Sequence, residues 1–282
     1  GFALNGIKAA LKAKPAAFYD PQAANLITAG NFDDHLDRLA DCDLVIEAVV
    51  ERMDIKQSLF TKVAKVVNEN TILASNTSGL SIAEMSSVLP EEMQKRFLVV
   101  HFFNPVRYMR LLELVAGPKT DENIMQQMAE FGEFLGKGIV YGKDTVNFVA
   151  NRIGVFGIMS VFNALNDFDL GLEEIDKIAG TPMGRPRSAV FRTGDLVGID
   201  TLAHVADNCY DNLPNDEQKE VFKVPEWVRE LIKSGRIGAK TKAGFYKKEG
   251  KTLKVFDPKT DDYRETKKVR FDSLGAVRKI SE

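Results

Sequence analysis

The run Asp43-Leu-Val-Ile-Glu-Ala-Val-Val50 decides the fold class, because it is short and almost wholly apolar. Such a run is typical of a β-strand that is buried on both faces, as the strands of parallel sheets are. Similar runs follow at 71–75, 97–100, 111–115 and 138–141. Helical patterns lie between most of these runs. The first half of the chain therefore predicts an α/β domain in which helices cover a parallel sheet.

Three features predict helices in this half. Phe2–Lys12 has a helical pattern, and two arrangements typical of a capping box follow, with Asp54 before Gln57 and Ser81 before Glu84. We expect a helix to begin at each of these caps.

The pattern changes near Lys143. The segment Asn147–Leu170 is apolar almost all round, which predicts a helix buried in a bundle or in a subunit contact. Further helical patterns lie at 172–179 and 224–232, and no strand pattern precedes Phe245. We therefore expect an α/β domain over residues 1–143, an all-α domain over 144–248, and a connector or small hairpin over 249–282.

Composition limits the function. The chain has 282 residues, a formal net charge of −2 and 44% hydrophobic residues, which are typical of a globular protein without a nucleic-acid-binding or membrane-spanning segment. Two distant cysteines and three scattered histidines do not predict a metal site. This usage fits the cytoplasm, and a mitochondrial matrix would look the same.

Polar side chains follow two of the predicted strands. Ser75-Asn-Thr-Ser78 follows one, and His101-Phe-Phe-Asn-Pro105 follows the next. Each could be purely structural, the first a turn with a helix cap and the second a hydrogen-bonded histidine. Glu113 favours a catalytic role for His101, because a carboxylate inside an apolar strand is costly to bury without a partner. A carboxylate that orients an imidazole is an acid–base unit.

Asn151-Arg152 is a second polar pair, near the start of the buried helix. Both side chains could cap a helix or bond to a neighbouring one. Alternatively, Asn151 points into a cleft between the two predicted domains.

Together these motifs resemble the 3-hydroxyacyl-CoA dehydrogenase family. The similarity covers nearly the whole chain up to Lys248, and it rests on Glu47–Glu51, Ser75–Ser78, His101–Pro105 with Glu113, Asn151-Arg152, Gly180–Gly184 and Gly244–Tyr246, which occur in the family's order. Arg185–Asp195 is similar to the dehydrogenase part of multifunctional fatty-acid oxidation proteins, and the tail after Gly250 is similar to the connector that leads to a further helical domain in such proteins.

The resemblance implies a Rossmann-like α/β domain followed by a helical domain, and oxidation of (3S)-3-hydroxyacyl-CoA to 3-oxoacyl-CoA with NAD in fatty-acid β-oxidation. His101 would be the general base, and Glu113 its orienting partner. Ser78 and Asn151 would hold the substrate oxygen and position the histidine and the acyl thioester.

The resemblance also implies the cofactor contacts. Glu51, Lys56 and Asn104 match cofactor-binding positions, Ser78 could touch both cofactor and substrate, and Lys240 matches a lysine that reaches toward the cofactor. Acyl-CoA would be the substrate, and the helical domain would pair with a second copy or with a further helical domain of the same chain.

The start of the chain departs from the family. A dinucleotide-binding domain should begin with a strand, a Gly-x-Gly-x-x-Gly loop and a helix, whereas Gly1 and Gly6 lie in a helical pattern. We expect that roughly 30–40 upstream residues are missing and that these 282 residues alone bind NAD poorly and are inactive.

Two alternatives remain at this point. The chain could be another NAD-dependent dehydrogenase that acts on a small hydroxy acid, or an inactive structural or assembly segment whose apolar helix makes a subunit contact.

Overall fold

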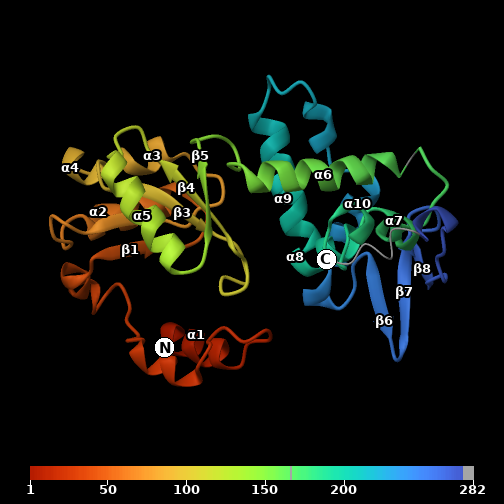
Figure 1. The fold of residues 1–282 in the computed structure, drawn as a ribbon, viewed down its shortest axis with the longest axis horizontal. Coiled ribbons are helices and arrows are strands. Elements are labelled where there is room, and N and C mark those ends of the chain that lie inside the picture. Colours follow the sequence, from red (N-terminus) through yellow and green to blue (C-terminus); the bar gives the residue numbers. More distant parts are fainter. Residues whose placement is uncertain (166, 276–282) are drawn as a thin grey trace. The chain divides into compact units, whose positions relative to one another are not determined.

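The computed structural model describes residues 1–165 and 167–275, and these form two compact units (Figure 1). The first unit comprises Gly1–Val149, and the second begins at Ala150. The chain thus divides a few residues after the predicted change of pattern near Lys143, and its C-terminal strands belong to the second unit.

The first unit is built on a five-stranded sheet in the order β1-β2-β3-β4-β5. Its strands are β1 (Leu44–Glu47), β2 (Ile72–Ser75), β3 (Phe97–Phe102), β4 (Leu111–Ala116) and β5 (Gly138–Gly142). All five coincide with predicted apolar runs. Neighbouring strands are parallel except β3 and β4, which are antiparallel. The prediction of a parallel sheet is wrong at this pair, because the connection over residues 103–110 is too short for a parallel crossover.

Apolar clusters cover both faces of this sheet. Alternate residues of β3 face opposite clusters, with Phe97 and Val99 in one and Leu98 and Val100 in the other. Helices α2 and α3 contribute to the first cluster and helix α5 to the second. The helical segments of this unit are α1 (Phe2–Leu11), two 3₁₀ helices (Pro21–Leu26 and Leu36–Asp41), α2 (Met53–Val63), α3 (Ile82–Ser86), α4 (Glu91–Gln94) and α5 (Glu122–Phe134).

One of the two predicted helix caps is correct. Ser81 caps α3 by accepting a hydrogen bond from the Glu84 N–H. The predicted cap at Asp54 is wrong, since α2 begins at Met53 and the Asp54 carboxylate pairs with Arg52 instead.

The second unit is mainly helical and ends in a small antiparallel sheet in the order β6-β7-β8. Its elements are α6 (Ala150–Ala164), α7 (Leu172–Ile178), α8 (Phe191–Val197), α9 (Ile199–Asn212), α10 (Glu226–Lys233), β6 (Tyr246–Glu249), β7 (Thr252–Asp257), β8 (Asp262–Glu265), and 3₁₀ helices at Thr181–Met183, Lys219–Phe222, Ala239–Thr241 and Asp272–Leu274. Helices α8 and α9 were not predicted.

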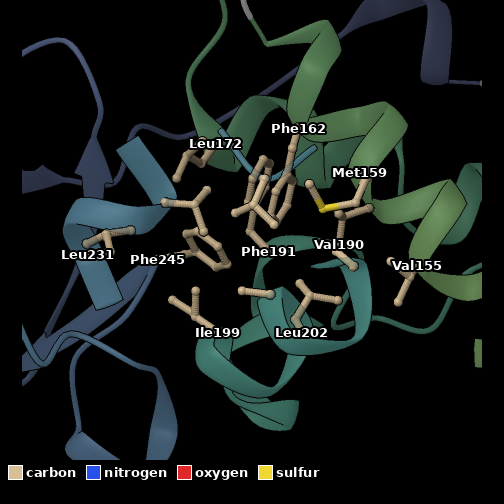
Figure 2. Packing of buried hydrophobic residues seen from close by; sticks show 14 of the residues in the cluster. Val155, Met159, Phe162, Leu172, Val190, Phe191, Ile199, Leu202, Leu231 and Phe245 are labelled. Carbon is tan, nitrogen blue, oxygen red and sulfur yellow. The ribbon is translucent and has the colours of Figure 1, made fainter. Parts of the chain in front are cut away.

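A hydrophobic core of aliphatic and aromatic side chains holds this unit together (Figure 2). The rings of Phe162 and Phe191 stack with centroids 5.1 Å apart, and the Phe245 ring meets both edge-on. Val255 and Phe256 of β7 lie in the same core. The segment 249–282, predicted to be a connector or a small hairpin, is therefore a structural part of the second unit as far as residue 275, and residues 276–282 lie outside the described part of the chain.

Helix α6 is less buried than its sequence predicts. Val155, Met159 and Phe162 are buried, but Ile153 is 67% exposed. In the described part of the chain, no helix has the length and apolar character needed to cross a membrane.

Candidate active site

His101 and Glu113 form a buried pair at the centre of the first unit. They lie directly opposite each other on the antiparallel strands β3 and β4, so their side chains lie on the same face. The His101 Nδ1 lies 2.7 Å from the Glu113 Oε2. Glu113 is fully buried and His101 is 4% exposed. This geometry confirms the predicted contact between the two residues.

Two aromatic rings and a backbone N–H group contact the His101–Glu113 pair. The Phe103 and Phe148 rings lie against the imidazole, with centroids 4.4 and 5.9 Å from it. The backbone N–H of Val149 donates to the other carboxylate oxygen of Glu113, the Oε1, at 3.1 Å. A Glu113 carboxylate that accepts from Nδ1–H leaves the Nε2 lone pair of His101 as a base.

A second buried cluster lies where β1 and β2 end. The Lys56 Nζ donates to both carboxylate oxygens of Glu47, at 2.7 and 2.9 Å, and to the Val49 carbonyl. The Ser75 hydroxyl also donates to Glu47. Lys56 is only 1% exposed. Its ammonium group therefore faces acidic side chains rather than solvent.

Glu51 connects this cluster to the Ser75–Ser78 segment. Its carboxylate lies 3.3 Å from the Lys56 Nζ and accepts from the Thr77 hydroxyl and, at 2.9 Å, from the Ser78 N–H. The Glu51 side chain is 39% exposed, so part of it remains open to a ligand.

Asn76 connects the two clusters. Its Oδ1 accepts from the Phe102 N–H at 2.9 Å, which ties the end of β2 to the residue after His101. Asn104 follows β3 in the 103–110 loop and is exposed. The structure thus places His101, Glu113, Ser78, Glu51, Lys56 and Asn104 within one unit.

The other two predicted site residues belong to the second unit. Asn151 is half-buried in the first turn of α6, and its neighbour Arg152 pairs with Asp216 at 2.5 Å. Lys240 lies on the 3₁₀ helix Ala239–Thr241, and its Nζ is 2.6 Å from the Asp200 Oδ2. Within this unit, Lys240 is thus an exposed cation held by a carboxylate.

Sequence reasoning missed three parts of the site. Glu47 could have been suspected by the argument used for Glu113, since it also interrupts an apolar strand. Asn76 was identified only as a member of its motif. The Val149 N–H has no signature in the sequence, because any residue except proline supplies a backbone donor.

The side chains at this edge of the sheet fit part of NAD. The open face of the Glu51 carboxylate can accept hydrogen bonds from ribose hydroxyls, and the Ser78 hydroxyl and the Asn104 amide can bond to polar groups of a nicotinamide ring. Within residues 1–165 and 167–275 we identify no glycine-rich loop between a strand and a helix for the pyrophosphate. The same residues contain no group of histidine, cysteine or acidic side chains placed to hold a metal ion.

Two domain descriptions of one protein family together match most of the chain. Residues 3–145 match the description "3-hydroxyacyl-CoA dehydrogenase, NAD binding domain", and residues 148–248 match "3-hydroxyacyl-CoA dehydrogenase, C-terminal domain".

Curated relatives carry the same name. The chain is 43% identical over 273 residues to a probable 3-hydroxyacyl-CoA dehydrogenase of Bacillus subtilis, covering 96% of this chain and 34% of that protein. It is 43% identical to a probable 3-hydroxyacyl-CoA dehydrogenase of Deinococcus radiodurans, covering 86% of this chain and 70% of the relative. This chain thus spans about a third of the Bacillus protein and over two thirds of the Deinococcus one.

Solved structures agree with the family assignment. FadB2 of M. tuberculosis matches with a TM-score of 0.75 and 30% identity, over 87% of this chain and 84% of that one. A 3-hydroxybutyryl-CoA dehydrogenase from Escherichia coli matches with a TM-score of 0.73 and 27% identity, over 97% of this chain and 55% of that one. With both domain descriptions matched in order and the His101–Glu113 pair in place, the chain belongs to the 3-hydroxyacyl-CoA dehydrogenase family, whose N-terminal domain binds NAD.

Proposed function

We propose that this chain carries the acid–base site of an enzyme that oxidises (3S)-3-hydroxyacyl-CoA to 3-oxoacyl-CoA with NAD, as in fatty-acid β-oxidation. The observation that carries the proposal is the buried His101 imidazole held through Nδ1 by Glu113. An imidazole with one nitrogen fixed in this way is suited to take a proton at the other.

In the proposed reaction, the His101 Nε2 takes the proton of the 3-hydroxyl group while the C–O single bond becomes a carbonyl. When bound, NAD would supply the acceptor for the hydride that leaves the same carbon. Glu113 stays ionised, keeps the second ring proton on Nδ1, and stabilises the imidazolium that forms. In the reverse direction, His101 returns the proton to the oxygen.

The remaining predicted residues take positioning roles in this proposal. Ser78 and Asn151 hold the substrate oxygen and the thioester, and Glu51, Asn104 and Lys240 contact the cofactor. Because Lys56 is buried against Glu47 and Glu51, it acts on the cofactor through Glu51, whose carboxylate it holds next to the Ser78 N–H.

Replacement of His101 tests this function. In the full-length protein, His101→Gln removes the base, and we expect the rate of NADH-dependent reduction of acetoacetyl-CoA to fall by about 10²–10⁴-fold with the circular dichroism spectrum unchanged. His204→Gln is a matched control, because His204 is an exposed histidine of the second unit. Near-normal turnover by His101→Gln would refute the assignment of the base.

A substrate panel tests the finer part of the proposal. The full-length wild-type protein should oxidise (3S)-3-hydroxyacyl-CoA thioesters and leave the (3R) isomers and free small hydroxy acids unchanged. A preference for a free hydroxy acid would support the alternative dehydrogenase instead.

A further inference from the structure

The last residues of the first unit have an unusual backbone. Asn147 has a φ of 58° and Phe148 a φ of 50°, so two consecutive residues other than glycine adopt left-handed conformations. Side chains disfavour this region, asparagine less than most and bulky residues strongly. Both residues are buried at 3% exposure. Packing must therefore maintain this conformation.

Contacts on both sides hold the segment in place. The Phe148 N–H donates to the Thr145 carbonyl at 3.0 Å. The neighbouring Asp144 carboxylate accepts from the Ile82 and Ala83 N–H groups at the start of α3. The Phe148 side chain lies in the core cluster with Phe97 and also against the His101 ring.

The left-handed conformation of Asn147 and Phe148 sets the direction of the N–H group that follows them. The Val149 N–H donates to the Glu113 Oε1, while the His101 Nδ1 lies against the Oε2. Contacts at both oxygens fix the plane of the carboxylate as well as its position. A change of φ at Asn147 or Phe148 would rotate the following peptides and carry the Val149 N–H away from Glu113.

We propose that the left-handed backbone at Asn147 and Phe148 is a positioning device for the acid–base pair, which acts by holding the Val149 N–H on Glu113. Asn147 is its key position, because its conformation can be changed without altering a ring that touches His101. This inference rests on the proposed function for its catalytic consequence, but its structural part does not depend on any substrate.

Three replacements of Asn147 separate the backbone from the side chain. Asn147→Gly, Asn147→Ala and Asn147→Val all remove the amide group, so any bond made by that side chain is lost equally. Only glycine adopts a positive φ freely, whereas alanine resists it and β-branched valine resists it most. If valine prevents folding, the comparison of glycine with alanine still decides.

The direct measurement is the tautomer of His101 by ¹⁵N NMR on histidine-labelled protein. The sequence contains only three histidines, so His101→Gln suffices to assign the signals. We expect a single tautomer with its proton on Nδ1 in the wild type and in Asn147→Gly. In Asn147→Ala and Asn147→Val we expect a mixture of tautomers or averaged signals.

Turnover is the second measurement. We expect kcat within about twofold of wild type for Asn147→Gly and about tenfold lower for Asn147→Ala, with little change in KM for acyl-CoA. Equal behaviour of all three variants in the NMR spectra would overturn the inference. An ordered Nδ1–H tautomer in a full-length protein without dehydrogenase activity would instead refute the proposed function and leave the positioning role intact.

Discussion

The two units of this chain bury acidic side chains in different ways. In the first unit, Glu47 pairs with the ammonium group of Lys56 and Glu113 with the imidazole of His101. In the second unit, Asp195 is held by two backbone N–H groups, those of Phe245 and Tyr246, at 2.7 and 2.9 Å. Asp176 accepts from the Val190 and Phe191 N–H groups and from the Tyr246 hydroxyl.

This difference separates carboxylates that can take part in a reaction from carboxylates that stabilise the fold. A carboxylate beside an imidazole can orient a proton transfer, whereas a carboxylate held mainly by backbone N–H groups joins chain segments. Asp195 joins α8 to the start of β6, and burial raises its pKa to about 6. We therefore expect replacements of the paired carboxylates of the first unit, or of their partners, to change turnover or to leave a charge unpaired, and replacements at Asp195, Asp176 and Tyr246 of the second unit to change stability alone. The four predictions below test that contrast, in decreasing order of free energy.

The largest effect is expected at Lys56. Lys56→Met leaves the buried Glu47 carboxylate without its cation, which should lower the free energy of unfolding by about 3–5 kcal/mol in a urea titration. Lys62→Met, on an exposed position of the same helix, is the control. The double variant Glu47→Gln/Lys56→Met should recover much of the loss. A loss below about 1 kcal/mol in the single variant would show that this pair is not essential to the fold.

The next effect is expected at Glu113. Glu113→Gln keeps the shape of the side chain but presents an amide to His101, so kcat should fall about 10²-fold, or about 2.7 kcal/mol of transition-state stabilisation. The double variant with His101→Gln should be no slower than His101→Gln alone, because the two residues act as a unit. Glu133→Gln, on an exposed position of α5, is the control. Additive losses would show that Glu113 does not act through the histidine.

The sequence predicted the sheet well because buried strands have a local signature. Each apolar run became a strand, and β3 and β4 are buried at nearly every position, which requires apolar side chains on both faces. Helices α8 and α9 were missed, and here Gly194 interrupts the pattern of α8 and Gly198 separates the two helices. A Cβ added to Gly194 would lie 2.8 Å from the Phe245 ring, so this glycine is set by a contact with a residue distant in sequence. The antiparallel direction of β4 follows from the short connection over residues 103–110, which the apolar pattern of the strand itself does not indicate.

The candidate site shows the same limit. Glu113 and His101 could be paired from sequence because each is a polar residue in an apolar strand, and their register brings them together. The burial of Lys56 could not be inferred, since a lysine on an amphipathic helix is usually exposed. The Val149 N–H could not be inferred either, because it depends on two backbone angles. The pairing of two site side chains was predictable from the sequence, whereas the role of a backbone N–H group was not.

A smaller effect is expected at Asp195, as a dependence of stability on pH. Its folded pKa of about 6 lies above the ordinary aspartate pKa of 3.8, so the folded state binds more protons between these values and stability falls as the pH rises through this window. We expect wild type to lose about 2 kcal/mol relative to Asp195→Asn between pH 4 and pH 6.5, in urea titrations at each pH. Above that window the difference should be constant. A difference that does not change from pH 4 to pH 6.5 would contradict the raised pKa.

The smallest effect is expected at Tyr246, and it tests the contrast between the units most directly. Tyr246→Phe removes the hydroxyl that donates to Asp176 at 2.9 Å, but the Val190 and Phe191 N–H groups still hold that carboxylate. The free energy of unfolding should therefore fall by only about 1 kcal/mol.

Tyr141→Phe provides the reference for that measurement, because Tyr141 is 63% exposed on β5 of the first unit. Turnover of Tyr246→Phe should stay within about twofold of wild type, since a carboxylate that only joins chain segments does not act on the substrate. A tenfold loss of kcat with unchanged stability would mean that the Asp176–Tyr246 contact serves the reaction. Buried carboxylates of both units would then share a catalytic role, and the distinction between imidazole-paired and backbone-held carboxylates would fail.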